Sequence, residues 1–336
     1  MKEALLYERL EKNLVRCNLC SHRCGIAEGK FGFCGVRQNV AGTLCTHAFG
    51  RLVAAHIDPI EKKPLYHFLP GTISFSIATM GCNFRCGFCQ NWQISQEVFN
   101  QRQVRGEEFS PQEIVKFALD HKCRSISYTY TEPTIFFEYA LETAKIAREK
   151  GLDNVFVTNG YMTKECLELA RSYLDAANVD LKFFKEDSYK SICQGSLQPV
   201  LDSIRLIHDM GIWIEITTLV VPKENDSEEE LRAIARFIAG VDKNIPWHIS
   251  RFHPDYKFID RPATAEATIR KAQEIAKDCG LHYVYAGNVY GWGNDTHCHN
   301  CGKLLIKREG FSVLEYNIEV GKCINCKTTV PGIFKY

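Results

Sequence analysis

The middle of the chain alternates between two patterns of hydrophobic and polar positions. Short apolar runs of the kind that form buried strands are each followed by a longer segment with the period of an amphipathic helix. The strand-like runs are ISFSIAT at 73–79, SISYTY at 125–130, NVFVT at 154–158, ANVDLK at 177–182, IWIEITTLVV at 212–221, WHISRF at 247–252 and HYVYA at 282–286. Six or seven strands that alternate with helices predict a parallel sheet with right-handed connections. Such a sheet either winds doubly or curls into a barrel, and the chemistry then belongs at the carboxyl ends of its strands.

Capping residues mark where several of these helices begin and end. Ser110 and Ser227 are each followed three positions later by glutamate, which predicts two capping boxes. Gly151 should end the helix before the third strand, and Gly240 should end the helix that Ser227 opens.

Charge and hydropathy narrow the class of protein. The 336 residues carry 41 Lys and Arg against 40 Asp and Glu, whereas a general nucleic-acid or membrane-surface binder usually carries a lopsided charge. The first residues, MKEALLYERLEKN, contain no signal-peptide core. The longest uncharged run, at 68–84, is too short and too polar for a membrane helix. We therefore expect a cytoplasmic protein with no membrane partner.

Sixteen cysteines are the anomaly in this composition. The cytoplasm keeps thiols reduced, so metal or iron–sulfur ligation becomes their leading use. Most of the cysteines fall into groups that divide the chain into three parts. These parts are an N-terminal cysteine-rich module at 1–66, the α/β region at 67–290, and a C-terminal segment at 291–336 that begins at a Gly-Trp-Gly break.

The central cysteine group follows the first strand-like run directly. Cys82, Cys86 and Cys89 have the spacing C-x3-C-x2-C, with no further cysteine before Cys123. Structural zinc requires four ligands in a closed shell. A [4Fe–4S] cluster held by three thiolates instead leaves one iron open to a ligand. At the carboxyl end of a strand, an open iron is a place where chemistry can occur.

This segment resembles the signature of the radical S-adenosylmethionine (SAM) superfamily, C-x3-C-x-Φ-C, with Phe88 as the aromatic residue before the last cysteine. The resemblance implies a partial (β/α)6 TIM-type barrel and a [4Fe–4S] cluster on Cys82, Cys86 and Cys89. It also implies SAM as cofactor, Phe88 beside it, and a low-potential electron donor of the flavodoxin or ferredoxin type. The chemistry would be reductive cleavage of SAM to a 5′-deoxyadenosyl radical, which removes hydrogen from a substrate.

Later strand ends resemble those of glycyl-radical-enzyme activases such as the pyruvate formate-lyase activating enzymes. The resemblance places four polar residues near the cofactor: Glu132, Asn159, Lys182 and His253. Three of these residues also have a purely structural interpretation. Glu132 would be a carboxylate at a helix N-terminus, Lys182 would form a surface ion pair, and His253 would make a hydrogen bond at a strand end. Two glycines of the activase pattern are missing before Glu132, and Val157 stands where those enzymes have aspartate.

A more specific resemblance covers roughly residues 10–290. The segments 58–68, 86–95 and 127–133 and the N-terminal cysteine group are similar to the radical enzyme of the AmmeMemoRadiSam system. This resemblance transfers the core chemistry but does not name a substrate.

Two outer cysteine groups each offer four soft ligands. The N-terminal set is Cys17, Cys20, Cys24 and Cys34, with His22 as a spare nitrogen donor. It fits structural zinc, which we favour slightly because a glycine-rich segment needs something to fold around, and it also fits an auxiliary iron–sulfur cluster. The C-terminal set is Cys298, Cys301, Cys323 and Cys326. Its paired knuckles flank a predicted β-hairpin with Gly310 at the turn, which is the arrangement of a zinc ribbon.

Five cysteines remain without a predicted role: Cys45, Cys123, Cys166, Cys193 and Cys279. The resemblance to glycyl-radical-enzyme activases implies hydrogen abstraction from the glycine backbone of a protein substrate. Within the same chemistry, modification of a small molecule, peptide or RNA is the alternative. The alternatives from other classes are a non-enzymatic iron–sulfur electron carrier and a metal-stabilised RNA-binding module. The substrate, the reductant and the outer metals are not determined by the sequence.

Overall fold

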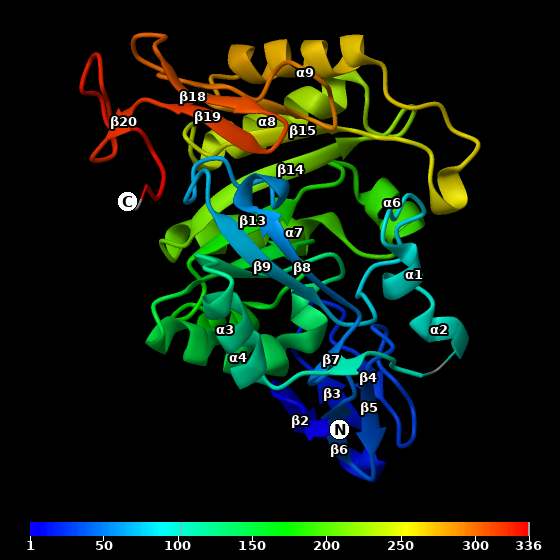
Figure 1. Cartoon of the computed structure of the whole chain (residues 1–336). Coiled ribbons are helices and arrows are strands. Elements are labelled where there is room, and N and C mark those ends of the chain that lie inside the picture. Colours follow the sequence, from blue (N-terminus) through cyan, green and yellow to red (C-terminus); the bar gives the residue numbers. More distant parts are fainter. Residues whose placement is uncertain (102, 335–336) are drawn as a thin grey trace.

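The computed structural model describes residues 1–101 and 103–334, which are organised around one eight-stranded sheet (Figure 1). The strand order is β16-β15-β14-β13-β12-β11-β9-β8, and every strand except β8 runs parallel to its neighbours. The strands are β8 (Ala54–Pro59), β9 (Ile73–Ala78), β11 (Ser125–Tyr128), β12 (Asp153–Thr158), β13 (Ala176–Asp180), β14 (Trp213–Val220), β15 (Trp247–Arg251) and β16 (Val284–Gly287). All seven strand-like runs are therefore adjacent in chain order, which confirms the predicted parallel α/β sheet.

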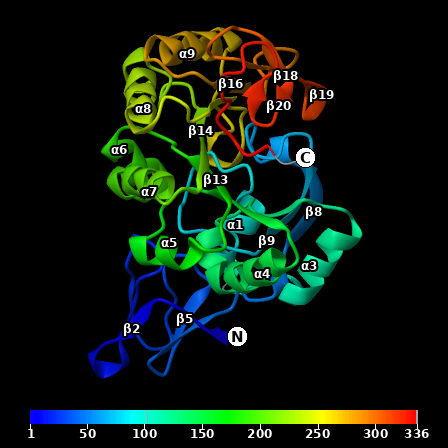
Figure 2. The same ribbon diagram turned by 90° about the vertical axis from the view of Figure 1, so that its left-hand side faces the viewer.

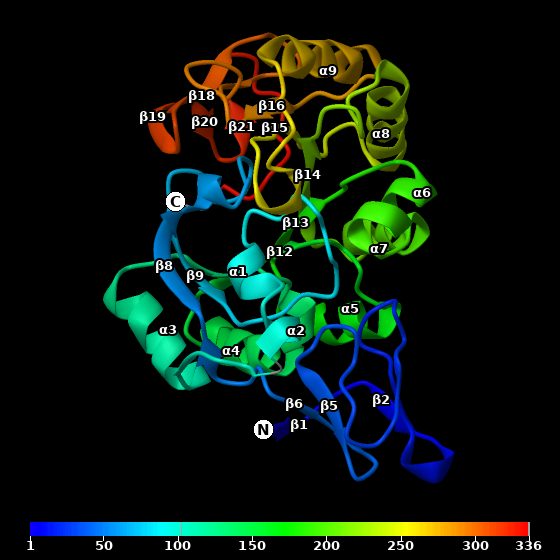
Figure 3. The ribbon, with the colours of Figure 1, turned by 90° about the vertical axis from the view of Figure 1, so that its right-hand side faces the viewer.

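The helices that connect these strands lie along one side of the sheet. They are α3 (Pro111–Asp120), α4 (Phe137–Glu149), α5 (Lys164–Ala170), α7 (Leu197–Asp209), α8 (Glu228–Val241) and α9 (Glu266–Asp278). Figures 2 and 3 show them as an arc around the curved strands, with α1 (Trp92–Ser95) on the inner side. The sheet thus curls toward a barrel instead of winding doubly. Within the part of the chain that the structure describes, no helix is both long and apolar enough to cross a bilayer.

Both predicted serine caps are present, but only one forms a complete capping box. Ser110 Oγ accepts a hydrogen bond from Glu113 N, and the Glu113 carboxylate accepts one from Ser110 N at 2.7 Å. Ser227 caps α8 in the same way, whereas the Glu230 carboxylate accepts from Phe184 N at 2.6 Å. The second capping-box prediction is wrong because Glu230 is buried and secures the loop after β13 instead.

The two glycines expected to end helices behave differently. α4 ends at Glu149, and Gly151 follows with a φ of +77°, as a helix-ending glycine should. Gly240 lies inside α8, which continues to Val241 and ends where Asp242 becomes extended. The predicted stop at Gly240 is therefore wrong, since a helix tolerates one glycine at an exposed position in its last turn.

Short strands of the N-terminal segment form small sheets beside one end of the barrel. These strands are β1 (Lys2–Glu3), β2 (Tyr7–Arg9), β3 (Val15–Cys17), β4 (Gly25–Ile26), β5 (Arg37–Val40), β6 (Thr43–Thr46) and β7 (Arg51–Leu52), the last of which pairs with β10 (Glu107–Glu108). Their apolar residues, such as Val15 and Leu44, belong to the same hydrophobic core as the barrel. β8 also precedes residue 66, so a boundary there divides the main sheet between β8 and β9.

The C-terminal segment forms two small sheets of its own. One contains β17 (Thr296–His297), β18 (Leu304–Glu309) and β19 (Ser312–Tyr316), and the other contains β20 (Ile318–Glu319) and β21 (Lys322–Cys323). Gly310 adopts a φ of +58° between β18 and β19, which confirms the predicted hairpin. Contacts with the segment before β9 attach the C-terminal segment to the barrel: Arg308 Nη2 donates to Tyr66 O at 2.7 Å, and Ile333 bridges to Phe68.

Candidate functional site

A cavity of about 300 Å³ lies at the carboxyl ends of the parallel strands. The loops after β9, β11, β12 and β13 supply most of its walls, in the position that sequence reasoning assigned to the chemistry. Its polar, sulfur-bearing and aromatic lining includes Lys62, Lys63, Cys82, Cys86, Phe88, Cys89, Gln90, Tyr130, Glu132, Asn159, Asp180, Lys182 and Ser250.

The three cysteines of the C-x3-C-x2-C segment all line this cavity. Cys89 Sγ lies 3.2 Å from Ser95 Oγ on α1, and Phe84 N donates to Cys82 Sγ at 3.4 Å. Burial raises the pKa of the Cys82 and Cys89 thiols, so they keep their protons until a metal replaces them. Three soft ligands around one cavity fit a [4Fe–4S] cluster whose remaining iron is open to a ligand.

Cys193, a residue without a predicted role, lies against this group. Its Sγ is 3.5 Å from Cys86 Sγ, and its carbonyl oxygen accepts from Arg85 N at 2.8 Å. The contact with Cys193, together with burial, raises the pKa of Cys86. Cys193 ends a π-helical turn, Tyr189–Cys193, that is remote in sequence from the C-x3-C-x2-C segment. No local pattern could therefore have identified it.

Glu132 lies in the cavity wall but already holds several protein donors. It is the N-cap of the 3-10 helix Pro133–Phe136, and its side chain is buried. One carboxylate oxygen accepts from Thr134 N at 3.0 Å and Thr158 Oγ1 at 2.8 Å, and the other accepts from Asn159 N at 2.8 Å. Burial raises the pKa of Glu132, opposed by these hydrogen bonds. Glu132 therefore acts as a carboxylate at a helix N-terminus, as the plainer interpretation predicts. Its contact with SAM stays a prediction.

Asn159, Phe88 and Lys182 all lie in the cavity wall as well. Asn159 Nδ2 donates to Asn83 Oδ1 at 2.7 Å, which joins the end of β12 to the cysteine segment. Lys182 Nζ lies 2.8 Å from Asp180 Oδ2, so it forms an ion pair, although inside the cavity and not on the surface. Their contacts with a cofactor stay predictions.

His253 is not brought into the cavity. Its side chain is exposed, and its Nε2 lies 2.8 Å from Gln90 Nε2. The chain leaves β15 at Arg251, so His253 points beyond the strand end, while Ser250 on β15 lines the cavity. Its partner Gln90 does line the cavity, so contact of His253 with a cofactor stays a prediction.

Two lysines that the predictions left out also line the cavity. Lys63 Nζ lies 2.6 Å from Asp58 Oδ2, and Tyr130 Oη donates to the same carboxylate. Lys62 Nζ lies 2.8 Å from the other carboxylate oxygen of Asp58. Burial lowers the pKa of Lys63 to about 8, although Asp58 opposes this. The run of polar residues at 58–63 was a signal in the sequence, but only β8 and the following turn show that it faces the cavity.

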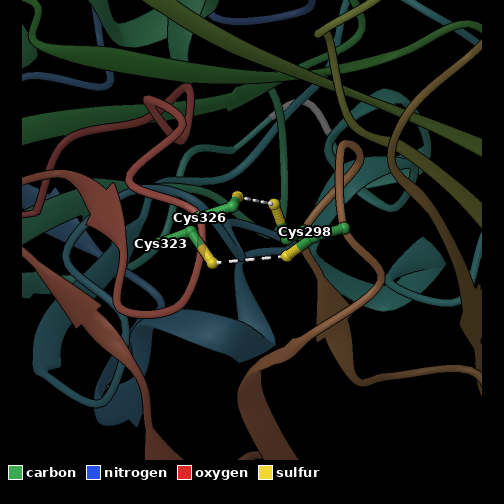
Figure 4. A group of neighbouring side chains, drawn as sticks. Cys298, Cys323 and Cys326 are labelled. Carbon is green, nitrogen blue, oxygen red and sulfur yellow. Dashed lines mark hydrogen bonds between the residues drawn. The ribbon is translucent and has the colours of Figure 1, made fainter.

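The four C-terminal cysteines come together as the paired-knuckle pattern predicts. Their sulfurs all lie within 4.8 Å of one another, with Cys298 Sγ 3.6 Å from Cys326 Sγ and Cys301 Sγ 3.7 Å from Cys323 Sγ. Figure 4 shows the labelled Cys298, Cys323 and Cys326 with their sulfurs turned toward a common centre. Four thiolates around one zinc ion lie about 3.8 Å apart, so this group fits a single tetrahedral ion.

The four N-terminal cysteines surround a second, smaller cavity of about 20 Å³. Burial raises the pKa of Cys34 to about 11 and also raises that of Cys20 and Cys24. His22 does not face this cavity as a spare ligand, because its Nε2 lies 2.7 Å from the carbonyl oxygen of Asn83.

Comparison with known proteins identifies the class to which this fold and cavity belong. The chain belongs to the radical SAM superfamily, whose family model matches residues 76–238. It is therefore an enzyme with radical SAM chemistry, which implies a [4Fe–4S] cluster and SAM. The two alternatives from non-enzymatic classes are set aside.

Two relatives and one solved structure illustrate the similarity. "Uncharacterized protein MJ0808" of Methanocaldococcus jannaschii is 46% identical over 330 residues, which cover 97% of this chain and 98% of that protein. The pyruvate formate-lyase-activating enzyme of Clostridium pasteurianum is 24% identical over 245 residues, covering 68% of this chain and 99% of that enzyme. A radical SAM methyltransferase from Sphaerobacter thermophilus shares the fold, with a TM-score of 0.52, 18% identity, and 70% and 71% of the two chains covered.

Proposed function

We propose that this enzyme generates a 5′-deoxyadenosyl radical in the barrel cavity and uses it to abstract hydrogen from a glycine backbone of a protein substrate. The radical part rests on one observation: Cys82, Cys86 and Cys89 line a single cavity at the carboxyl ends of parallel strands. The similarity to the pyruvate formate-lyase-activating enzyme of Clostridium pasteurianum supports the glycine-backbone part. We take the chain to be a cytoplasmic member of the AmmeMemoRadiSam group, on the segments that resemble it.

Different residues of the cavity wall have different proposed roles in binding the cofactor and excluding water. When bound and reduced by one electron from a flavodoxin- or ferredoxin-type donor, the cluster supplies the electron that breaks a carbon–sulfur bond of SAM. Asn159 and Glu132 would hold the methionine end, since they lie together at the ends of β12 and β11. The Lys182–Asp180 pair offers both a cation and an anion deeper in the same wall. Phe88 packs against Phe183 and restricts access of water.

A second candidate substrate is a small anionic molecule. Lys62 and Lys63 both reach the cavity wall, and among the described residues only one carboxylate, that of Asp58, pairs with the two ammonium groups. An anion that enters the cavity would meet the remaining positive charge. Protein radical formation does not require this feature.

One experiment separates the two candidates. Anaerobically reconstituted enzyme, SAM and dithionite are incubated with candidate glycyl-radical proteins carrying α-deuterated glycine, and 5′-deoxyadenosine is analysed by mass spectrometry. Deuterium in 5′-deoxyadenosine, together with a glycyl radical signal in electron paramagnetic resonance (EPR), supports the activase function. Deuterium uptake only from a deuterated small anion would contradict it and support the second candidate.

The C-terminal segment, residues 291–336, completes the proposal. We assign one zinc ion to Cys298, Cys301, Cys323 and Cys326, because the sulfurs are spaced for a single tetrahedral ion. The hydrophobic cluster of this segment is small, so a bound metal would supply stability that its core lacks. This zinc ribbon is the part of the chain that we expect to contact a macromolecular partner.

A further inference from the structure

The three cysteine groups of this chain differ in the spacing of their sulfurs. Within the described residues, the ribbon cysteines form a group whose ligand atoms all lie within 4.8 Å of one another, and neither the barrel nor the N-terminal cysteines form such a group. The barrel and N-terminal groups instead each line a cavity. A single zinc ion needs the tight spacing, whereas a four-iron cluster holds its thiolates farther apart around an inorganic core. The N-terminal group therefore follows the barrel pattern and not the ribbon pattern.

A buried cation lies beside the sulfurs of the N-terminal cavity. Arg37 lines the cavity with a side chain that is about 1% exposed, and its Nη1 donates to Cys17 Sγ at 3.0 Å. The Nη2 of the same guanidinium forms a buried ion pair with the Glu138 carboxylate, which fixes the orientation of Arg37. Its Nε is buried and has no hydrogen-bond partner among the described residues. Phe33 N donates to Cys24 Sγ at 3.5 Å. A buried guanidinium and a backbone N–H directed at sulfur are the contacts that stabilise thiolates in iron–sulfur sites.

From these observations we propose that Cys17, Cys20, Cys24 and Cys34 bind a second [4Fe–4S] cluster, with all four irons ligated by protein. This assignment differs from the sequence-based one, which slightly favoured zinc at these four cysteines. A closed shell of four thiolates leaves no iron open, so SAM would bind only at the barrel group. The inference goes beyond the proposed function and does not depend on the identity of the substrate.

The N-terminal cavity lies next to the barrel cysteine loop, so a cluster bound there could pass electrons to the barrel cluster. The N-terminal and barrel cysteine loops contact each other directly. Arg85, between Cys82 and Cys86, donates to Phe33 O, and a Cβ added to Gly81 would lie 2.9 Å from Cys34 O. The 3-10 helix Pro133–Phe136 follows a wall residue of the barrel cavity and itself lines the N-terminal cavity through Thr134 and Ile135.

Because the two sites are this close, we expect the N-terminal cluster to relay electrons. One electron would enter it from the low-potential donor and one would leave it toward the barrel site, with no bond or proton changed. Donor proteins could then dock on the N-terminal segment without blocking the mouth of the barrel.

The test uses the full-length chain with the barrel ligands removed by Cys82→Ala, Cys86→Ala and Cys89→Ala. After anaerobic reconstitution with iron and sulfide, this triple variant should retain about four irons and four sulfides per chain and show an EPR signal on reduction. Adding Cys20→Ala to the triple variant should remove that iron. Adding Cys301→Ala, the matched control in the ribbon, should leave it in place.

Two results would overturn the proposal. One is a folded triple variant without iron and with a second equivalent of zinc. The other is iron that is lost with Cys301→Ala but not with Cys20→Ala. If the Cys20→Ala protein does not fold, Mössbauer spectra of the triple variant decide, since a four-iron cluster and an iron bound by four ribbon thiolates differ in their spectra. SAM cleavage by the unmodified enzyme is measured separately, so failure here is distinct from failure of the radical assignment.

Discussion

The sulfur of Cys193 lies 3.5 Å from the sulfur of Cys86, although the two residues are far apart in the sequence. The turn that carries Cys193 also accepts a backbone hydrogen bond from Arg85, so it supports the cysteine loop at two points. Cys86 is expected to bind iron as a thiolate, in which case the thiol hydrogen of the pair belongs to Cys193. Cys193 would then be a positioning residue that donates to a cluster ligand, and not a ligand itself.

Replacement of Cys193 tests this assignment. Cys193→Ala should retain the barrel cluster and SAM cleavage, while the midpoint potential of that cluster falls, because a donor to thiolate stabilises the reduced state. A weak S–H donor contributes at most about 1 kcal/mol, which corresponds to roughly 40 mV for one electron. Redox titration followed by EPR measures the shift, and Cys193→Ser, which keeps a donor, is the control. Loss of the barrel cluster in Cys193→Ala would show instead that Cys193 is a ligand.

Glu132→Gln should destabilise the fold by about 1–3 kcal/mol. Its two carboxylate oxygens accept from Thr134 N and Asn159 N, so either orientation of the glutamine amide directs an NH2 group at a buried backbone N–H. Thermal or denaturant unfolding of the apoprotein measures this loss, and Glu149→Gln, at an exposed position, is the control. An unchanged melting temperature would contradict the capping role.

A SAM titration of the Glu132→Gln variant tests the ligand contact. If the Glu132 carboxylate accepts a charge-assisted hydrogen bond from SAM, the affinity for SAM should fall tenfold to a hundredfold.

The strand sequence and the barrel cysteines could be predicted because their signals are local. Each parallel strand is a short run rich in apolar residues, and Cys82, Cys86 and Cys89 are close in sequence. Phe88, Glu132, Asn159 and Lys182, which the resemblance placed near the cofactor, also line the cavity. The remaining contacts could not be predicted because they are assembled over long separations in the sequence. Lys63 reaches the wall only through the pairing of β8 with β9, and Cys193 reaches Cys86 only through an irregular turn.

His253 shows how precisely a strand end must be located. A motif at a strand end suggested a residue beside the cofactor, and the structure places His253 against Gln90 of the cavity wall but not among the lining residues. The exposed position of His253 is a consequence of where β15 ends, at Arg251. Periodicity locates a strand end only to within a few residues, which is too coarse to decide which side chain enters a cavity.

His67 should make the stability of the protein depend on pH. Burial lowers the pKa of His67 to about 4 while Nδ1 lies 2.7 Å from Pro331 O and Nε2 lies 2.6 Å from Tyr285 Oη. Between the ordinary histidine value of about 6.5 and pH 4, the unfolded chain binds a proton that the folded chain does not. The free energy of unfolding should therefore fall as pH falls through that window, by up to about 3 kcal/mol from this residue.

Denaturant unfolding at several pH values measures this effect. His67→Gln should flatten the pH dependence, and His56→Gln, at an exposed position on β8, should leave it as in the unmodified protein. A pH dependence of the same steepness in His67→Gln would contradict the assignment.

The ribbon should lose its metal and its fold together. Cys323→Ser removes a buried ligand from a closed four-thiolate shell, so about one zinc ion per chain should be lost and residues 296–330 should become protease-sensitive. The barrel should keep its iron, because its cysteines do not belong to this group. Metal analysis and limited proteolysis provide the readouts, and Cys279→Ala, a cysteine outside all three groups, is the control. Full zinc content with an intact ribbon would contradict the structural role of this site.

The most direct test of the account is SAM cleavage at the barrel cysteines. Reconstituted enzyme with dithionite and SAM should produce 5′-deoxyadenosine and methionine, measured by mass spectrometry. Because three thiolates hold the cluster as one unit, Cys86→Ala should abolish both products, while Cys279→Ala should produce them at the rate of the unmodified enzyme. Cleavage of SAM by Cys86→Ala at the unmodified rate would contradict the assignment of the radical chemistry to this cavity.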